Sequence, residues 1–161
     1  MKNNFKKLLF GLMLLFLGFT TESFAQYNTG IGLRAGSGNG LTVKHFLNEG
    51  AAIEGILHTR WRGLVVTGLY EVHREIREVR GLQWFYGGGA HLGTWNANNR
   101  NTPWGDNSAS STIVGLDGII GLDYKFINAP INLSLDWKPT LNFGDAGFWG
   151  DEVALSIRFA F

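Results

Sequence analysis

The chain has 161 residues, no cysteine, 23 glycines and a formal net charge of +1. This length suits one domain, and the small net charge gives no indication of a nucleic-acid partner. Without cysteine, the chain has neither a disulfide framework nor a lipid anchor on an N-terminal cysteine.

Residues 1–25 have the pattern of a secretory signal peptide. Basic residues precede an apolar run from Leu8 to Phe19, and Ser23-Phe24-Ala25 fits the small residues of a cleavage site. The run is short for a membrane-spanning helix of ~20 residues, so we expect cleavage after Ala25 rather than a retained anchor. Removing three of 14 basic and one of 13 acidic residues leaves the mature chain, residues 26–161, with a formal charge of −1.

Residues 26–161 alternate between apolar and polar or small side chains with a period of two, which is typical of strands with two different faces. No later apolar run approaches the length of a membrane helix, so this chain could enter a membrane only as strands. We predict eight strands, at 27–36, 40–46, 51–61, 64–73, 82–95, 112–126, 131–143 and 152–161.

The two faces of these strands differ in charge. One face is apolar and carries almost no charge, with His45 as its doubtful member. Glycine occupies many positions of the other face, which also carries most of the charged residues. The residues predicted to form a network of charges there are Arg34, Lys44, Glu54, Arg60, Glu71, Asp117, Asp123, Lys125, Asp136, Lys138 and Arg158.

The positions of the aromatic residues along the strands, together with the lengths of the loops, favour a barrel with the charged face inside. With the N-terminus in the periplasm, outward aromatics gather near the periplasmic rim, and Trp61 and Phe143 lie near the opposite rim. Two such girdles are expected of outer-membrane barrels, as are short periplasmic turns and longer outer loops. Two outer connections, 96–111 and 144–151, are long, whereas the first two outer loops are very short. The residues predicted for the periplasmic girdle are Tyr27, Tyr70, Trp84, Tyr86, Tyr124, Phe126, Phe159 and Phe161.

The last strand is amphipathic and ends in Phe159-Ala160-Phe161. It resembles the C-terminal insertion signal of outer-membrane barrels, which assembly machinery reads, with Phe159 and Phe161 as its aromatic residues. The glycine-rich segment 84–91 and the segment 133–139 also resemble the small bacterial outer-membrane β-barrel family of about eight strands, which includes porin-like and OmpX-like proteins. The resemblance covers the mature chain.

This resemblance implies an all-β fold, a closed antiparallel up-and-down transmembrane β-barrel of eight strands. It also implies insertion into the cell outer membrane after export, with membrane lipid and the barrel-assembly machinery as partners. It says little about function, because members of the family include adhesins, structural proteins and uncharacterised barrels.

Several residue patterns are typical of cofactor, metal or catalytic sites, but the segments around them do not suit such sites. The G-x-G-x-x-A pattern of residues 30–35 leads into another strand, whereas a dinucleotide site needs a helix. We therefore expect no cofactor. His58 and His73 lie toward opposite ends of the inner face, so we expect no metal site. Ser134 and Ser156 face the lumen, whereas an enzyme acting on lipid needs its groups near the membrane surface. We expect no catalytic residue.

The expected function follows from the filled lumen and the loops. Six positive and five negative inner side chains nearly balance, and an eight-stranded interior is just wide enough for side chains to fill it. We expect a monomer with paired core charges, no wide pore, and a structural or surface-interaction role. A lipid-modifying enzyme, a narrow channel and a soluble periplasmic ligand-binding barrel stay open as alternatives. Candidate surface contacts are Trp104, Phe148 and Trp149. The alternative, which we favour over ligand contact, is an outer aromatic girdle on the membrane surface.

Overall fold

A computed structural model describes residues 28–96, 111–144 and 146–161, and these residues form an all-β structure without a helix. None of the described residues belongs to a helix long and apolar enough to cross a membrane. The predicted signal peptide and Trp104 lie outside the described residues. The strands are β1 (Thr29–Gly36), β2 (Asn39–Asn48), β3 (Ala51–Arg60), β4 (Gly63–Glu75), β5 (Leu82–Trp95), β6 (Ser111–Lys125), β7 (Ile131–Trp137), β8 (Thr140–Asn142), β9 (Phe148–Trp149) and β10 (Val153–Ala160).

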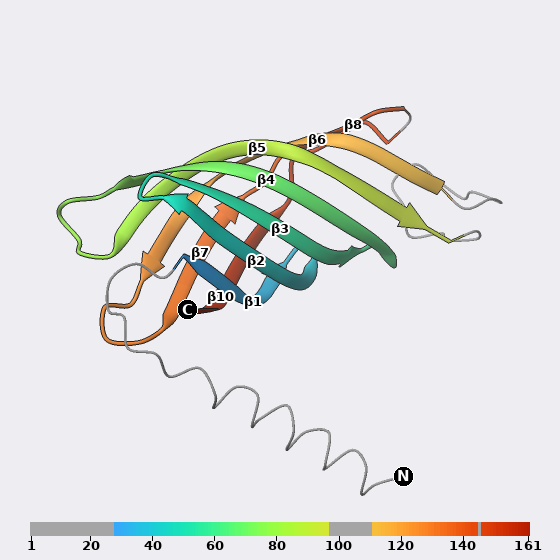
Figure 1. Ribbon diagram of the computed structural model, residues 1–161. Coiled ribbons are helices and arrows are strands. Elements are labelled where there is room, and N and C mark those ends of the chain that lie inside the picture. The colour runs from blue at the N-terminus through green and yellow to red at the C-terminus, as the bar shows by residue number, and fades with distance from the viewer. Residues whose placement is uncertain (1–27, 97–110, 145) are drawn as a thin grey trace, which may run out of the picture.

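The strands close into an eight-stranded antiparallel up-and-down β-barrel (Figure 1). Strands β1 to β6 pair with their neighbours in chain order, and β10 pairs with both β7 and β1. Segments β7 and β8 both pair with β6 and together form the seventh strand. Segments β9 and β10 lie against β8 and β7 and form the eighth. The predicted all-β fold, a closed antiparallel up-and-down barrel, and the predicted number of strands are confirmed.

The seventh strand is interrupted, whereas the sequence predicted a continuous strand over 131–143. The break falls at Lys138-Pro139, because proline has no N–H group to donate to the β-ladder. The Pro139 carbonyl still accepts a hydrogen bond of 2.9 Å from the Gly118 N–H. Pairing with β6 keeps one register on both sides of the break, Ile120 with Trp137 and Leu116 with Leu141.

The two ends of the barrel carry different connections. We call the end that holds Asn28 and Phe161 the termini end; it also holds the turns 49–50, 76–81 and 126–130. The opposite end, which we call the far end, holds the turns 37–38 and 61–62 and residues 143–144 and 146–147. At 61–62 both turn residues, Trp61 and Arg62, have positive φ angles of 46° and 61°. A two-residue hairpin of this kind matches the twist of the flanking strands.

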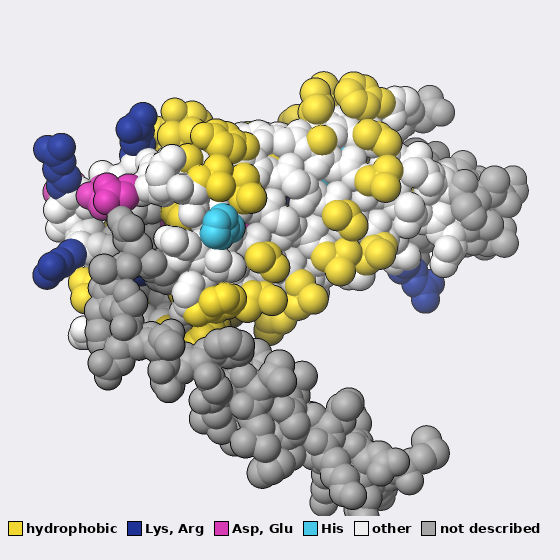
Figure 2. Space-filling view, viewed as in Figure 1, with side chains coloured by type: hydrophobic (Ala, Val, Ile, Leu, Met, Phe, Trp, Pro, Cys, Tyr) yellow, Lys and Arg dark blue, Asp and Glu magenta, His cyan; other side chains and the backbone are white. Residues whose placement is uncertain are grey.

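The polarity of the barrel is the reverse of that of a soluble protein. Outward positions carry exposed apolar side chains on every long strand, such as Leu33 at 61%, Leu116 at 52% and Ile157 at 51% relative exposure. Inward positions carry the buried charges. Figure 2 shows hydrophobic side chains over the wall of the barrel, with Lys and Arg side chains toward its two ends.

Candidate functional site

The interior of the barrel gathers the charged side chains that alternate with the outward apolar ones. All the residues predicted for the charge network are buried except Lys125, which is half-buried at the termini end. Glu152 is also buried, at 1% relative exposure, although the sequence analysis did not include it. Its even position places it on the same side of the strand as Ser156 and Arg158, so the alternation could have identified it.

Five charged residues form a network near the termini end, which we call the termini-end network. Its centre is Lys44, whose Nζ lies 3.1 Å from Glu54 Oε2, 2.8 Å from Glu71 Oε2 and 3.5 Å from Asp123 Oδ2. Arg158 donates to Glu54 as well and lies 4.0 Å from Asp123. These contacts join β2, β3, β4, β6 and β10 across the lumen.

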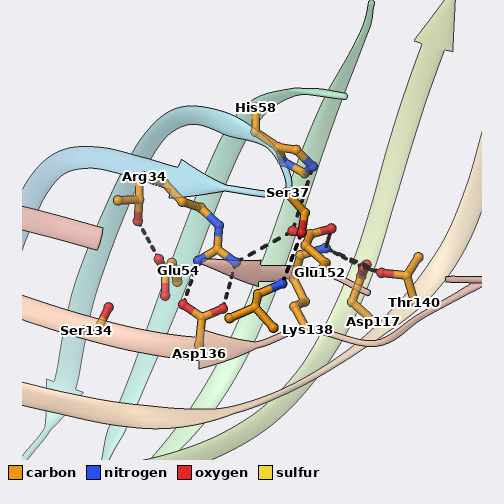
Figure 3. A network of polar contacts seen from close by, with 12 residues as sticks. Arg34, Ser37, Glu54, His58, Asp117, Ser134, Asp136, Lys138, Thr140 and Glu152 are labelled. Carbon is orange, nitrogen blue, oxygen red and sulfur yellow. Dashed lines mark hydrogen bonds and ion pairs between the residues drawn. The ribbon is translucent and has the colours of Figure 1, made fainter. Parts of the chain in front are cut away.

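A second network, the far-end network, centres on Glu152 (Figure 3). The Glu152 carboxylate lies 3.2 Å from Arg60, 3.1 Å from Lys138 and 3.6 Å from Arg34. Arg34 also donates two hydrogen bonds, of 2.7 and 2.6 Å, to both oxygens of Asp136. This bidentate geometry is the strongest form of an arginine–carboxylate pair.

The far-end network extends to Asp117 and to the exposed Asp151. Lys138 Nζ lies 3.0 Å from Asp117, which also accepts a 2.8 Å hydrogen bond from Thr140. Arg60 donates to Asp151 at the far rim and lowers the pKa of that carboxyl. The network therefore runs from the interior to the far opening.

An apolar cluster made of Ile56, Leu69, Phe85 and Ile119 also lies in the lumen. Along β3, Ile56 separates Glu54 from the far-end residues, and along β6 Ile119 separates Asp123 from Asp117. Phe85 is fully buried beneath Lys44 Nζ, which lies 4.2 Å from the ring centroid. The lumen is therefore filled by two charged layers and an apolar cluster.

Three buried histidines, His58, His73 and His91, belong to this packing. His91 lies 2.9 Å from Asp117 through Nδ1 and 3.0 Å from Asn142 through Nε2. His73 stacks on Phe85 with ring centroids 5.0 Å apart and lies 3.0 Å from Glu71. Among the residues that the structure describes, no group of three or more histidine or acidic side chains is arranged to hold a metal ion.

Aromatic side chains pack together at the far end of the lumen, and this corrects the prediction for Trp149. The sequence predicts that Trp149 is exposed on an outer loop. In the structure, its side chain points into the barrel and has a relative exposure of 6%. It packs with Val65, Trp95 and Ile113. Trp61, predicted for an outward girdle, lies edge-on to Trp149 with centroids 4.8 Å apart. Trp149 therefore belongs to the interior, and the half-buried Trp61 packs against it from the turn.

The reason for the error lies in a one-residue shift between β9 and β10. Strand β10 pairs Val153 with Trp137, whereas β9 pairs Trp149 with Thr140, so the register changes by one residue between them. Such a shift moves side chains to the opposite face of a sheet. Trp149 therefore faces inward although Val153, which has the same parity, faces outward. Phe148 is exposed at 65%, as predicted.

Glycines make room for the large interior side chains at the far end. A Cβ atom at Gly63 would lie 2.2 Å from the indole nitrogen of Trp95, and one at Gly93 would lie 2.4 Å from its ring. The indole N–H donates a 3.0 Å hydrogen bond to the Arg60 carbonyl. The glycines on the inner face therefore let an aromatic plug fit inside a narrow barrel.

The termini end has a polar cavity of about 380 Å³. Its lining includes Glu49, Glu75, Gln83 and Lys125, with Asp123 at its inner side. Lys125 thus belongs to the rim rather than to the buried network. Phe159 and Phe161 are exposed at 42% and 61% on the same end, and their role in insertion remains a prediction.

The charges of the interior nearly balance. The deeply buried cations are Arg34, Lys44, Arg60, Lys138 and Arg158, and the deeply buried carboxylates are Glu54, Glu71, Asp117, Asp123, Asp136 and Glu152. Five cationic side chains therefore lie among six carboxyl groups. Ser134 and Ser156 are buried at 1% and 0%, so neither presents a nucleophile to a substrate outside the barrel.

No protein-family model matches the chain, and no curated protein matches it either. What can be inferred about function therefore comes from the barrel and its surfaces.

Proposed function

We propose that this protein is an integral outer-membrane β-barrel with a solid, charge-paired core and no wide pore. Its role on this proposal is structural or one of surface interaction. The observation that carries the proposal is the reversed polarity: apolar side chains cover the outside of the wall, and most charged side chains of the strands are buried inside. In water, so large an exposed apolar surface would be strongly unfavourable, whereas a bilayer covers it at no such cost.

The outward aromatics support a membrane location. Tyr70, Trp84, Tyr86, Phe126 and Phe159 are all exposed, between 39% and 51%, toward the termini end. Tyrosine and tryptophan prefer the interface between lipid and water, because one side of the ring is apolar and the other forms hydrogen bonds. On this proposal, the termini end faces the periplasm and Phe148 lies at the outer surface.

The filled lumen supports the absence of a wide pore. Charged side chains that line an aqueous pore remain hydrated. The charged side chains inside this barrel instead contact one another and are almost completely buried. Removing one partner from such a buried pair is costly, because the other charge is left unpaired. The narrow channel is therefore less well supported than the solid core, and so is an enzyme that would use the buried serines.

Membrane insertion can be tested on the purified mature chain. The protein should stay in solution only with detergent, float with phospholipid vesicles after an alkaline wash, and change its gel mobility when boiled. Recovery of a folded barrel in buffer without detergent would contradict the proposal and favour the soluble ligand-binding barrel.

The solid core has a separate test. Planar bilayers that contain the inserted protein should show no stable, large unit conductance. The matched control is a variant that empties the central cluster, Phe85→Ala with Ile119→Ala, recorded in the same lipid. Large steps from the unmodified protein would show that the lumen conducts ions.

A further inference from the structure

A depression lies on the outer wall of the barrel, across β2, β3, β4 and β5. It has a volume of about 600 Å³ and is lined by His45, Ile53, Gly55, Gly68, Tyr70 and Gly88, among others. Two rows of paired residues form it. His45, Ile53, Tyr70 and Gly88 follow one another across the four strands, and Val43, Gly55, Gly68 and Ala90 form the next row toward the far end.

Bare backbone forms the floor of this depression. Gly55 and Gly68 are directly paired on adjacent strands, and a Cβ atom added to either would meet nothing within 4 Å. Leu57 and Val66, which pair in the following row toward the far end, carry outward side chains that are exposed at 40% and 51%. The hollow is therefore a gap in the outward apolar layer.

A polar group stands at the end of the depression nearer the termini. His45 is the one histidine outside the lumen, and it is exposed among apolar side chains; Figure 2 shows a histidine side chain in this setting. Thr29 Oγ1 lies 2.8 Å from its Nδ1, which fixes the ring. Among the described residues, none makes a hydrogen bond with Nε2. An imidazole in an apolar layer is unfavourable unless its polar atoms are hydrogen-bonded.

We propose that the depression binds one acyl chain of a phospholipid, and that His45 and Tyr70 bind an oxygen of its ester or phosphate group. The inference rests on the proposed membrane location. The depression and its two polar side chains match an amphipathic ligand, with the tail along Gly55 and Gly68 and the head toward the termini end. Tyr70 belongs to the aromatic girdle, and the glycerol and phosphate groups of a lipid leaflet lie at that depth.

A second copy of the chain fits this surface less well. In a twofold dimer whose axis passes through this patch, the two hollows would face each other and the bare glycine backbone of both would stay uncovered. A flexible acyl chain can follow the hollow, and its head can supply the oxygen that His45 Nε2 needs.

The test uses the mature protein refolded in phospholipid-free detergent and titrated with palmitoyl-oleoyl-phosphatidylethanolamine. Native mass spectrometry counts the retained lipid. The unmodified protein should retain one phospholipid, and Gly68→Leu should lose it because the new side chain fills the floor. His45→Phe should bind the lipid roughly tenfold more weakly, the loss of one hydrogen bond to a charged group. The control Ala35→Leu, also outward but on β1, should bind as the unmodified protein does.

Two outcomes would overturn the inference. Equal lipid retention by the unmodified protein, Gly68→Leu and His45→Phe would show that the depression holds no particular lipid. A dimer that Gly68→Leu converts to monomer in light scattering would assign the surface to a second copy. Flotation with vesicles separates this site from the proposed function: Gly68→Leu should float normally, whereas failure of the unmodified protein to float would contradict the membrane location itself.

Discussion

Glu152 shows how one side chain can hold several strands of the barrel together. Its carboxylate contacts Arg34 on β1, Arg60 on β3 and Lys138 beside β7, and its side chain is 1% exposed. Because those three cations share it, its loss leaves them with only two buried carboxylates in the far-end network, Asp117 and Asp136.

We predict that Glu152→Gln destabilises the barrel by about 3 kcal/mol, because the amide keeps the shape but removes the charge. Urea unfolding in lipid vesicles, followed by tryptophan fluorescence, measures the change. The control is Glu78→Gln in the exposed turn 76–81, which should change stability by less than ~0.5 kcal/mol. Equal stability of the two variants would mean that the far-end network does not stabilise the fold.

Trp149 and Phe148 are adjacent in the sequence but differ in their surroundings. Trp149 packs against Val65, Trp95 and Ile113, whereas Phe148 is 65% exposed. We predict that Trp149→Ala lowers the free energy of unfolding by about 3–5 kcal/mol, since it leaves a cavity. Phe148→Ala should leave stability nearly unchanged and weaken contact with a surface ligand or with the membrane surface. Thermal unfolding of both variants in the same detergent decides this, and reversed effects would refute the assignment.

At the scale of the strands, period-two alternation predicted most of the barrel because closure gives every strand one inner and one outer face. The buried positions of Arg34, Glu54 and Arg158 follow from that alternation once the charged face is assigned to the inside. Alternation did not predict the break at Pro139, which comes from the missing N–H of proline. It did not predict the register shift before Val153 either, since that shift depends on pairing with neighbouring strands. For the same reason, the partners of each charge and the inward side of Trp149 required the structure.

The connection between β5 and β6 should be dispensable for folding. Trp95 pairs directly with Ser111, so the two strands stay paired up to the start of this connection. Deleting residues 98–108 leaves four residues to join the paired ends, a common length for a hairpin loop. We predict an unchanged gel shift on boiling and an unchanged melting temperature for the deletion variant. A barrel that no longer folds would show that the connection contributes contacts to the core, and lost surface binding with normal folding would assign it a functional role.

At the scale of the whole molecule, the outward apolar layer sets the membrane thickness that the barrel fits. On β6 it runs from Val114 to Tyr124, with Leu116, Ile120 and Leu122 exposed between them. At ~3.4 Å per residue and a tilt of ~45°, this row covers about 24 Å of height. A typical bilayer has a hydrocarbon core of ~30 Å, so the proposed barrel matches a membrane thinner than average.

We therefore predict that refolding into vesicles depends on the length of the lipid chains. Insertion should be faster and more complete in dimyristoleoyl-phosphatidylcholine than in dierucoyl-phosphatidylcholine, because thick bilayers must thin around the short apolar layer. Both lipids are fluid and have the same headgroup, so chain length is the variable under test. The gel shift before boiling measures the inserted fraction over time. Equal yields and rates in the two lipids would mean that the outward apolar rows do not lie in the hydrocarbon core. The membrane-spanning arrangement would then be wrong.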